Sequence, residues 1–202
     1  MAMRTTTLAA FSLVSACGGV DGKPLTLSTP LAGADGGVVT IGTPCELVEE
    51  SDPSFTGSAV GEVSVESSSG QPSGAAVCIA YHFQGRASCP YGQPATGQTS
   101  GRPPCSTPDG QPVVGSVDAQ CLDRRAAGVV VWSCRCANDR GGTSDGASYC
   151  SCPSGTACTQ SVLALGSDPD DLSGAYCLPP TAFYDAAHAC TAQCDPVSNP
   201  CD

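Results

Sequence analysis

Cysteine is the residue that most limits how this chain can fold. There are 15 cysteines among 202 residues, together with 24 glycines and 17 prolines. Large apolar side chains are sparse after residue 45, and a core built mainly from valine, alanine and cysteine buries little apolar area. Covalent cross-links therefore have to supply much of the stability. The composition predicts a mainly β, small disulfide-rich domain with short helices and long loops.

Two Cys-x-Cys segments lie at the centre of the cysteine-rich region. Cys134 and Cys136 follow the most apolar run after residue 45, and Cys150 and Cys152 come after a polar, glycine-rich gap. Residues i and i+2 of a strand share a face, so an antiparallel register would join Cys134 to Cys152. The same register would join Cys136 to Cys150. Two adjacent cross-strand bridges would strain the preferred disulfide geometry, so bonds from each strand to a neighbouring loop are the alternative.

The same four thiols also have a spacing that suits a zinc ion. An oxidising compartment favours disulfides over zinc, so we expect no metal and no cofactor. Fourteen cysteines lie between residues 45 and 201, and this even number predicts seven disulfides whose pairing the sequence does not determine. A redox enzyme is not expected, because the chain has no Cys-x-x-Cys motif. The predicted disulfide cysteines are Cys45, Cys78, Cys89, Cys105, Cys121, Cys134, Cys136, Cys150, Cys152, Cys158, Cys177, Cys190, Cys194 and Cys201.

Hydrophobic patterning predicts short strands rather than long helices. Apolar runs rich in valine and aromatic residues indicate strands, the first two forming a hairpin with a long connection. Cys158, Val162 and Leu165 recur at i, i+4 and i+7, which predicts a short amphipathic helix. The predicted elements are strands at 60–66, 75–83, 129–137, 147–153 and 175–178, a helix at 156–166, helical turns at 186–194, and proline-rich loops over 84–120.

The first residues have the features of an export signal. Arg4 precedes a short apolar run at 8–14, which then meets small residues. This arrangement predicts a secretory signal peptide, and the run is too short to span a bilayer. We expect a signal peptide at 1–16.

Residues 14–17, Val-Ser-Ala-Cys, resemble a bacterial lipobox, the site read by lipoprotein signal peptidase. The resemblance implies that Cys17 carries a diacylglyceryl thioether and becomes the acylated first residue. Gly18 at the next position implies sorting to the outer membrane. The alternative is a signal peptide cut elsewhere, with Cys17 an ordinary thiol. The count favours the lipid, because fourteen cysteines remain when Cys17 is set aside.

The segment after Cys17 contains no cysteine until Cys45 and is rich in small and polar residues. We therefore expect a lipidated flexible tether at 17–44, or alternatively an edge strand at 37–41, and a disulfide-rich domain at 45–202. The net charge of −11 excludes nucleic acid as a partner, since its phosphates need a basic face. The expected partners are a membrane, through lipidated Cys17, and an unidentified protein or glycan ligand.

Three patterns that suggest catalysis or metal binding have simpler explanations. Residues 142–146 match the G-x-S-x-G hydrolase motif, but that motif needs a strand running directly into a helix, and here it lies in a polar loop. His82 and His188 are the two histidines available as a base, and both suit the surface. Acidic residues at 168–171 lack the spacing of a calcium loop and predict a solvated loop.

A broader similarity covers about residues 75–202. The spacing of residues 134–138, 145–153 and 174–177 resembles uncharacterised Cys-rich exported proteins of Gram-negative bacteria. The resemblance implies export and oxidised cysteines, and it carries no activity.

Together, these features predict a lipid-anchored outer-membrane protein, facing the periplasm or the cell exterior, with a structural or binding role and no enzymatic activity. Its loops at 84–120 and 138–147 would be presented to a ligand. The alternative is an exported enzyme, a hydrolase or a thiol–disulfide exchanger, with an unrecognised site. A cleft that gathers a histidine with carboxylates and a serine would favour the enzyme.

Overall fold

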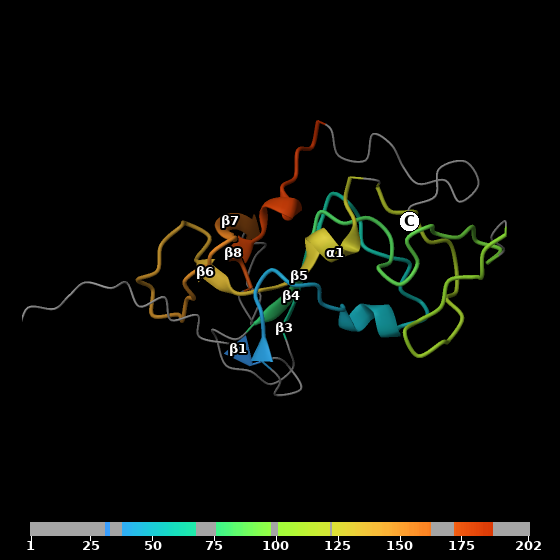
Figure 1. The fold of residues 1–202 in the computed structure, drawn as a ribbon, viewed down its shortest axis with the longest axis horizontal. Coiled ribbons are helices and arrows are strands. Elements are labelled where there is room, and N and C mark those ends of the chain that lie inside the picture. Colours follow the sequence, from blue (N-terminus) through green and yellow to red (C-terminus); the bar gives the residue numbers. More distant parts are fainter. Residues whose placement is uncertain are drawn as a thin grey trace, which may run out of the picture.

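The computed structural model describes residues 31–32, 38–67, 76–97, 101–121, 123–162 and 172–187 (Figure 1). These residues form two three-stranded antiparallel sheets, a short pair of strands near the start, and a few short helical turns. The predicted fold class, a mainly β disulfide-rich domain with short helices and long loops, is confirmed.

The first sheet holds most of the apolar core. Its strand order is β3-β4-β5, with bounds Val63–Ser67, Val77–Tyr81 and Val130–Ser133. Ile79 of β4 lies opposite Val65 on one side and Val131 on the other. All of β4 is buried, so this strand packs on both faces. The predicted hairpin of the first two strands is confirmed.

The second sheet follows directly from the first. The chain leaves β5, passes through Cys134 and enters β6, and the sheet order is β6-β8-β7, with bounds Arg135–Ala137, Gly174–Leu178 and Ala157–Val162. The central strand β8, predicted at 175–178, is buried along its whole length. Ser133 donates a hydrogen bond from Oγ to the carbonyl oxygen of Cys177 at 2.8 Å, which joins the two sheets.

Two predicted elements are wrong. Residues 147–153 form no strand, and β6 pairs with β8 instead. That segment is attached to β6 by a backbone hydrogen bond from Cys150 to Arg135, at 2.9 Å, and by a disulfide. Residues 157–162 form strand β7 rather than a helix. Their side chains include the β-branched Thr159 and Val162, which suit a strand, and pairing with β8 outweighs the helical spacing.

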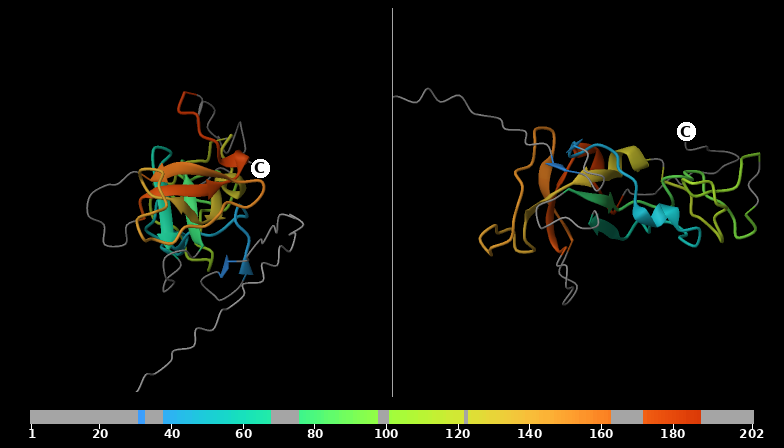
Figure 2. Two further views of the ribbon diagram at one scale, coloured as in Figure 1. Left: turned by 90° about the vertical axis from the view of Figure 1, so that its left-hand side faces the viewer. Right: turned by 90° about the horizontal axis from the view of Figure 1, so that it is seen from below.

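The loop region 84–120 projects away from the sheets at one end of the molecule, and the polar loop 138–147 lies at the other (Figures 1 and 2). The described parts of 84–120 contain isolated bridges in place of strands. The predicted loops over 84–120 are confirmed in these described parts.

A buried ion pair organises the loop region. The Arg86 side chain is fully buried and lies 3.3 Å, Nε to Oε2, from the carboxylate of Glu50, which belongs to the 3-10 helix η1 (Val48–Ser51). Arg86 also donates to the carbonyl oxygens of Glu50, Asp52 and Phe55. Backbone carbonyls that no strand satisfies are thus paired with a cation, as buried polar groups require.

The residues just before Cys45 are joined to the first sheet. Strand β1 (Leu31–Ala32) pairs with β2 (Val38–Val39), which lies in the segment where an edge strand was the alternative. The amide of Gly42 then donates to the carbonyl of Trp132 at 2.7 Å, and Cys45 is bonded to Cys78 of β4.

The division of the chain at residue 44 stays a prediction. The signal peptide and Cys17 lie outside the described residues. Within the described part of the chain, no helix has the length and apolarity needed to cross a bilayer.

Candidate functional site

Six cysteine sulfurs gather around the second sheet. They form three disulfides, Cys134–Cys150, Cys136–Cys158 and Cys152–Cys177. We call these six residues the sulfur cluster. Four of them come from the sheet or its approach, and Cys150 and Cys152 come from the irregular segment that precedes β7.

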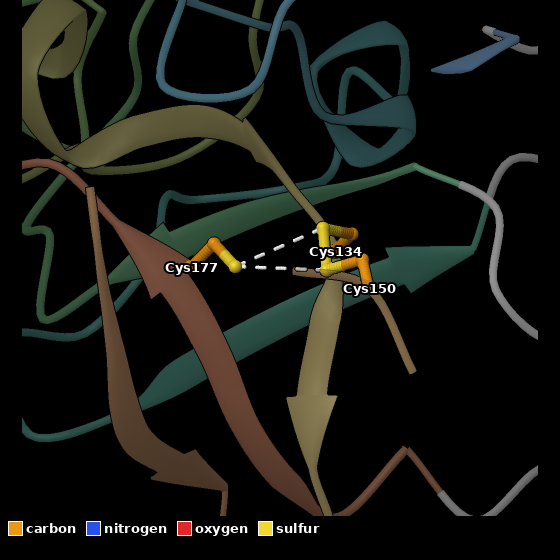
Figure 3. A group of neighbouring side chains, drawn as sticks. All are labelled: Cys134, Cys150 and Cys177. Carbon is orange, nitrogen blue, oxygen red and sulfur yellow. Dashed lines mark hydrogen bonds between the residues drawn. A yellow bond between two sulfur atoms is a disulfide. The ribbon is translucent and has the colours of Figure 1, made fainter. Parts of the chain in front are cut away.

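The sulfur atoms fall into two groups of three. In the first, the Sγ of Cys177 lies 3.8 Å from that of Cys134 and 3.6 Å from that of Cys150 (Figure 3). In the second, the Sγ atoms of Cys136, Cys152 and Cys158 all lie within 4.8 Å of one another. Each group holds one complete disulfide and half of a second. The disulfide Cys152–Cys177 therefore connects the two groups.

Exposure changes across the cluster. Cys134 and Cys177 are fully buried, and they pack with Ala137 and Ala175 in a small apolar core. Cys136 is buried in the same core, Cys150 and Cys152 are half-buried, and Cys158, on β7, is exposed. Because β7 is the last strand in the order β6-β8-β7, the cluster runs from the interior to an edge of the sheet.

Of the two alternatives for the Cys-x-Cys segments, the cross-strand pairing is wrong. Cys134 bonds Cys150 rather than Cys152, and Cys136 bonds Cys158 rather than Cys150. The alternative, bonds between a strand and a neighbouring loop, describes Cys134–Cys150 and Cys152–Cys177. The four-cysteine zinc pattern is divided, since its members lie in different groups of three and are all disulfide-bonded.

The other cysteines are placed as follows. Cys45 bonds Cys78, and Cys89 bonds Cys105 within a separate apolar cluster that includes Val113. Cys121 is disulfide-bonded as well. The predicted disulfide positions Cys190, Cys194 and Cys201 lie outside the described residues, as do His188 and the acidic residues 168–171.

His82 lies directly after β4 in an aromatic environment. Its ring stacks on Tyr184 with centroids 3.8 Å apart, and its Nδ1 is 2.9 Å from the carbonyl oxygen of Val60. Burial lowers the pKa of His82; the Val60 hydrogen bond raises it by less, and the charge of Arg124 lowers it further. The imidazole is therefore neutral at neutral pH.

Arg124 fixes this environment. Its guanidinium donates to the carbonyl oxygens of Tyr81, His82 and Phe183, at 2.6 Å for His82 and 2.7 Å for Phe183. It also lies 5.2 Å from the centre of the Tyr184 ring. In the described part of the chain, the contacts of His82 include neither a carboxylate nor a serine side chain, the two partners that the histidine of a catalytic triad has.

An apolar groove borders the same residues. It has a volume of about 550 Å³ and is lined in part by Tyr81, Leu178, Pro180, Phe183 and Tyr184. Phe183 follows the 3-10 helix η2 (Pro180–Ala182), and 77% of its surface is exposed. Sequence reasoning missed this groove, although two adjacent prolines and a Phe-Tyr pair after β8 were a local signal.

The G-x-S-x-G match lies in the exposed polar loop, as expected. Asp145 closes that loop by accepting hydrogen bonds from the Nδ2 of Asn138 at 2.9 Å and the hydroxyl of Tyr149 at 2.7 Å. These hydrogen bonds, the Asn138 one foremost, hold the pKa of Asp145 at about 2. Ser144 is exposed and no strand leads into a helix here, so the nucleophile elbow is missing from this loop.

No family model, curated protein or solved structure matches this chain.

Proposed function

We propose that this chain is an exported, lipid-anchored protein whose disulfide-bonded domain has a structural or binding role at the outer membrane. One observation carries the proposal. Each cysteine in the described part of the chain is disulfide-bonded, in five pairs and at Cys121. Disulfides of this density persist in oxidising compartments, whereas cytosolic thiols are kept reduced.

Anchoring is supported by the N-terminal sequence. The lipobox-like residues 14–17 end in Cys17, and an even number of cysteines remains for bridges when Cys17 is acylated. Each buried methylene contributes about 0.8 kcal/mol to membrane binding, so two or more acyl chains hold a protein at the membrane stably. The domain would then face the periplasm or the cell exterior.

A binding or structural role is favoured over hydrolysis. The contacts of His82 in the described residues are aromatic rings, a backbone carbonyl and Arg124, which gives no base–nucleophile pair. The domain instead offers exposed loops at both ends, the pattern of a scaffold that presents loops to a ligand.

Lipidation is tested by growing cells that express the full chain with radiolabelled palmitate. We expect label in the parent protein and none in Cys17→Ala. Ser15→Ala is the matched control, because it keeps a lipobox and changes a neighbouring residue, so it should be labelled like the parent. Equal labelling of Cys17→Ala, or no label in the parent, would refute the anchor.

The redox state has its own test. The mature protein is denatured without reductant and its free thiols are counted with a chromogenic disulfide reagent. We expect fewer than about one thiol per chain. Several free thiols per chain would contradict export to an oxidising compartment, whatever the labelling shows.

A further inference from the structure

We propose that the sulfur cluster is a thiol–disulfide exchange site that accepts two electrons from an external dithiol at Cys158 and passes them inward through three disulfides. The proposal goes beyond a structural or binding role and does not depend on the lipid anchor. It rests on the distances between sulfurs of different disulfides and on the change in exposure across the cluster.

The reaction begins at the disulfide Cys136–Cys158, in which Cys158 is exposed and Cys136 is buried. An external thiolate attacks the Sγ of Cys158, because this residue is exposed and lies on the edge strand β7. The bond between Cys136 and Cys158 breaks. A mixed disulfide forms at Cys158, and Cys136 leaves as a thiolate.

The connecting disulfide carries the exchange inward. The Sγ of Cys136 lies within 4.8 Å of the Sγ of Cys152. Attack there forms Cys136–Cys152 and releases the thiolate of Cys177. No segment has to unfold for this step, because the sulfurs of Cys136 and Cys152 are already neighbours.

The last step reaches the buried disulfide. The released Cys177 lies 3.6 Å from the Sγ of Cys150 and 3.8 Å from that of Cys134. These similar distances place Cys177 beside the Cys134–Cys150 bond (Figure 3), so in-line attack needs a rotation about its χ1 angle, which release from Cys152 permits. Attack on Cys150 forms Cys150–Cys177 and frees Cys134.

The electrons and atoms balance through the second thiol of the external dithiol. This second thiol attacks the external sulfur of the mixed disulfide. The external dithiol then leaves as a disulfide, and Cys158 is released as a thiol. The protein gains two electrons and two protons, which appear as thiols at Cys158 and at Cys134. Cys134 is fully buried and belongs to the last disulfide of the sulfur cluster that the exchange reaches, so the exchange comes to rest there.

The proposal is tested on the mature, oxidised full chain with one equivalent of dithiothreitol. The reaction is quenched with acid, thiols are alkylated, and disulfides are mapped by mass spectrometry. We expect new bridges joining Cys136 to Cys152 and Cys150 to Cys177, with thiols at Cys134 and Cys158. Thiols at Cys136 and Cys158 alone, with Cys152–Cys177 and Cys134–Cys150 intact, would overturn the proposal. Equal reduction of Cys89–Cys105 would also overturn it, because that disulfide belongs to a separate cluster.

A variant pair isolates the connecting disulfide. Replacing both Cys152 and Cys177 with serine removes the link, so reduction should stop at Cys136–Cys158 and leave Cys134–Cys150 intact. The matched control replaces Cys89 and Cys105 with serine and should form the new bridges like the parent. A thiol at Cys134 in the first variant would overturn the proposal, and if that variant fails to fold, the map of the parent chain decides alone.

Discussion

Gly85 and Gly110 form a matched pair that tests how tightly the loop region is packed. Both have left-handed backbones with nearly equal φ, 84° and 86°. A Cβ atom on Gly85 would lie 2.2 Å from the carbonyl oxygen of Asp118, whereas a Cβ on Gly110 would have no atom within 4 Å. Substitution by alanine therefore imposes a similar backbone strain at both positions and a steric clash only at Gly85.

The difference in stability can be worked out from these contacts. A left-handed backbone costs an L-residue about 1–2 kcal/mol, and the smaller freedom of alanine in the unfolded chain returns about 0.4–1 kcal/mol. Gly110→Ala should therefore lower the free energy of unfolding by about 1 kcal/mol. Gly85→Ala adds overpacking against rigid backbone, typically about 1–3 kcal/mol.

The clash at Gly85 also threatens two hydrogen bonds. The amide and carbonyl of Gly85 are both paired with Ser58, each at 2.9 Å, and a shift of the backbone weakens contacts that contribute about 1 kcal/mol each. Gly85→Ala is thus expected to cost about 3–5 kcal/mol in total, roughly 2–4 kcal/mol more than Gly110→Ala.

The assay is guanidinium unfolding of the oxidised full chain, followed by near-ultraviolet circular dichroism. Similar m values in the variants would show that stability alone has changed. A difference between the two variants smaller than about 0.5 kcal/mol, the range of an ordinary surface substitution, would refute the packing of residue 85 against Asp118.

Two further predictions concern buried or partly buried titratable groups. Glu50→Gln leaves the Arg86 charge buried without its counter-ion and should lower the free energy of unfolding by about 3–5 kcal/mol. Glu46→Gln, at an exposed position, is the control and should change the free energy of unfolding by less than about 0.5 kcal/mol. Equal effects of the two substitutions in chemical denaturation would contradict the buried pair. Burial lowers the pKa of His82 from 6.5, so its contribution to stability is complete above 6.5 and is lost as the pH falls from there through the lowered pKa of the folded state. His82→Asn, which tolerates the φ of 50°, should flatten the pH dependence of unfolding as the pH falls below 6.5; an unchanged slope would show that His82 is not the group responsible.

The features that follow from local sequence could be predicted. The hairpin of β3 and β4 forms where apolar residues recur around Val65 and Ile79, and β8 forms at the short apolar run before Leu178. Cysteine content predicted a cross-linked β domain because the large apolar residues are few. Each of these inferences needs only the residues of one segment or the composition of the whole chain.

The features that depend on partners distant in the sequence could not be predicted. Arg86 is fully buried because Glu50, 36 residues earlier, and three backbone carbonyls surround it, and nothing near Arg86 in the sequence indicates this. Strand β7 was predicted as a helix from the spacing of its apolar residues. That spacing carries no information about β8, the strand with which β7 pairs. Disulfide partners are likewise set by where the segment before β7 lies against β6 and β8, which the Cys-x-Cys spacing does not encode.

The sulfur cluster shows why such pairing is difficult to infer and why it can change. The native bridges Cys136–Cys158 and Cys152–Cys177 close separations of 22 and 25 residues, and the exchanged bridges Cys136–Cys152 and Cys150–Cys177 would close separations of 16 and 27.

Reduction without exchange leaves Cys134–Cys150 and Cys152–Cys177, which close 16 and 25 residues. Reduction with exchange leaves Cys136–Cys152 and Cys150–Cys177, which close 16 and 27 residues. Loop-closure entropy grows only as the logarithm of length, so it distinguishes these products by roughly 0.1 kcal/mol. The loss of chain entropy in the unfolded state, which makes each bridge stabilising, is therefore almost the same for both sets of partners. The choice between them falls to packing, because the second thiol is Cys136, which is 7% exposed, without exchange and Cys134, which is fully buried, with exchange.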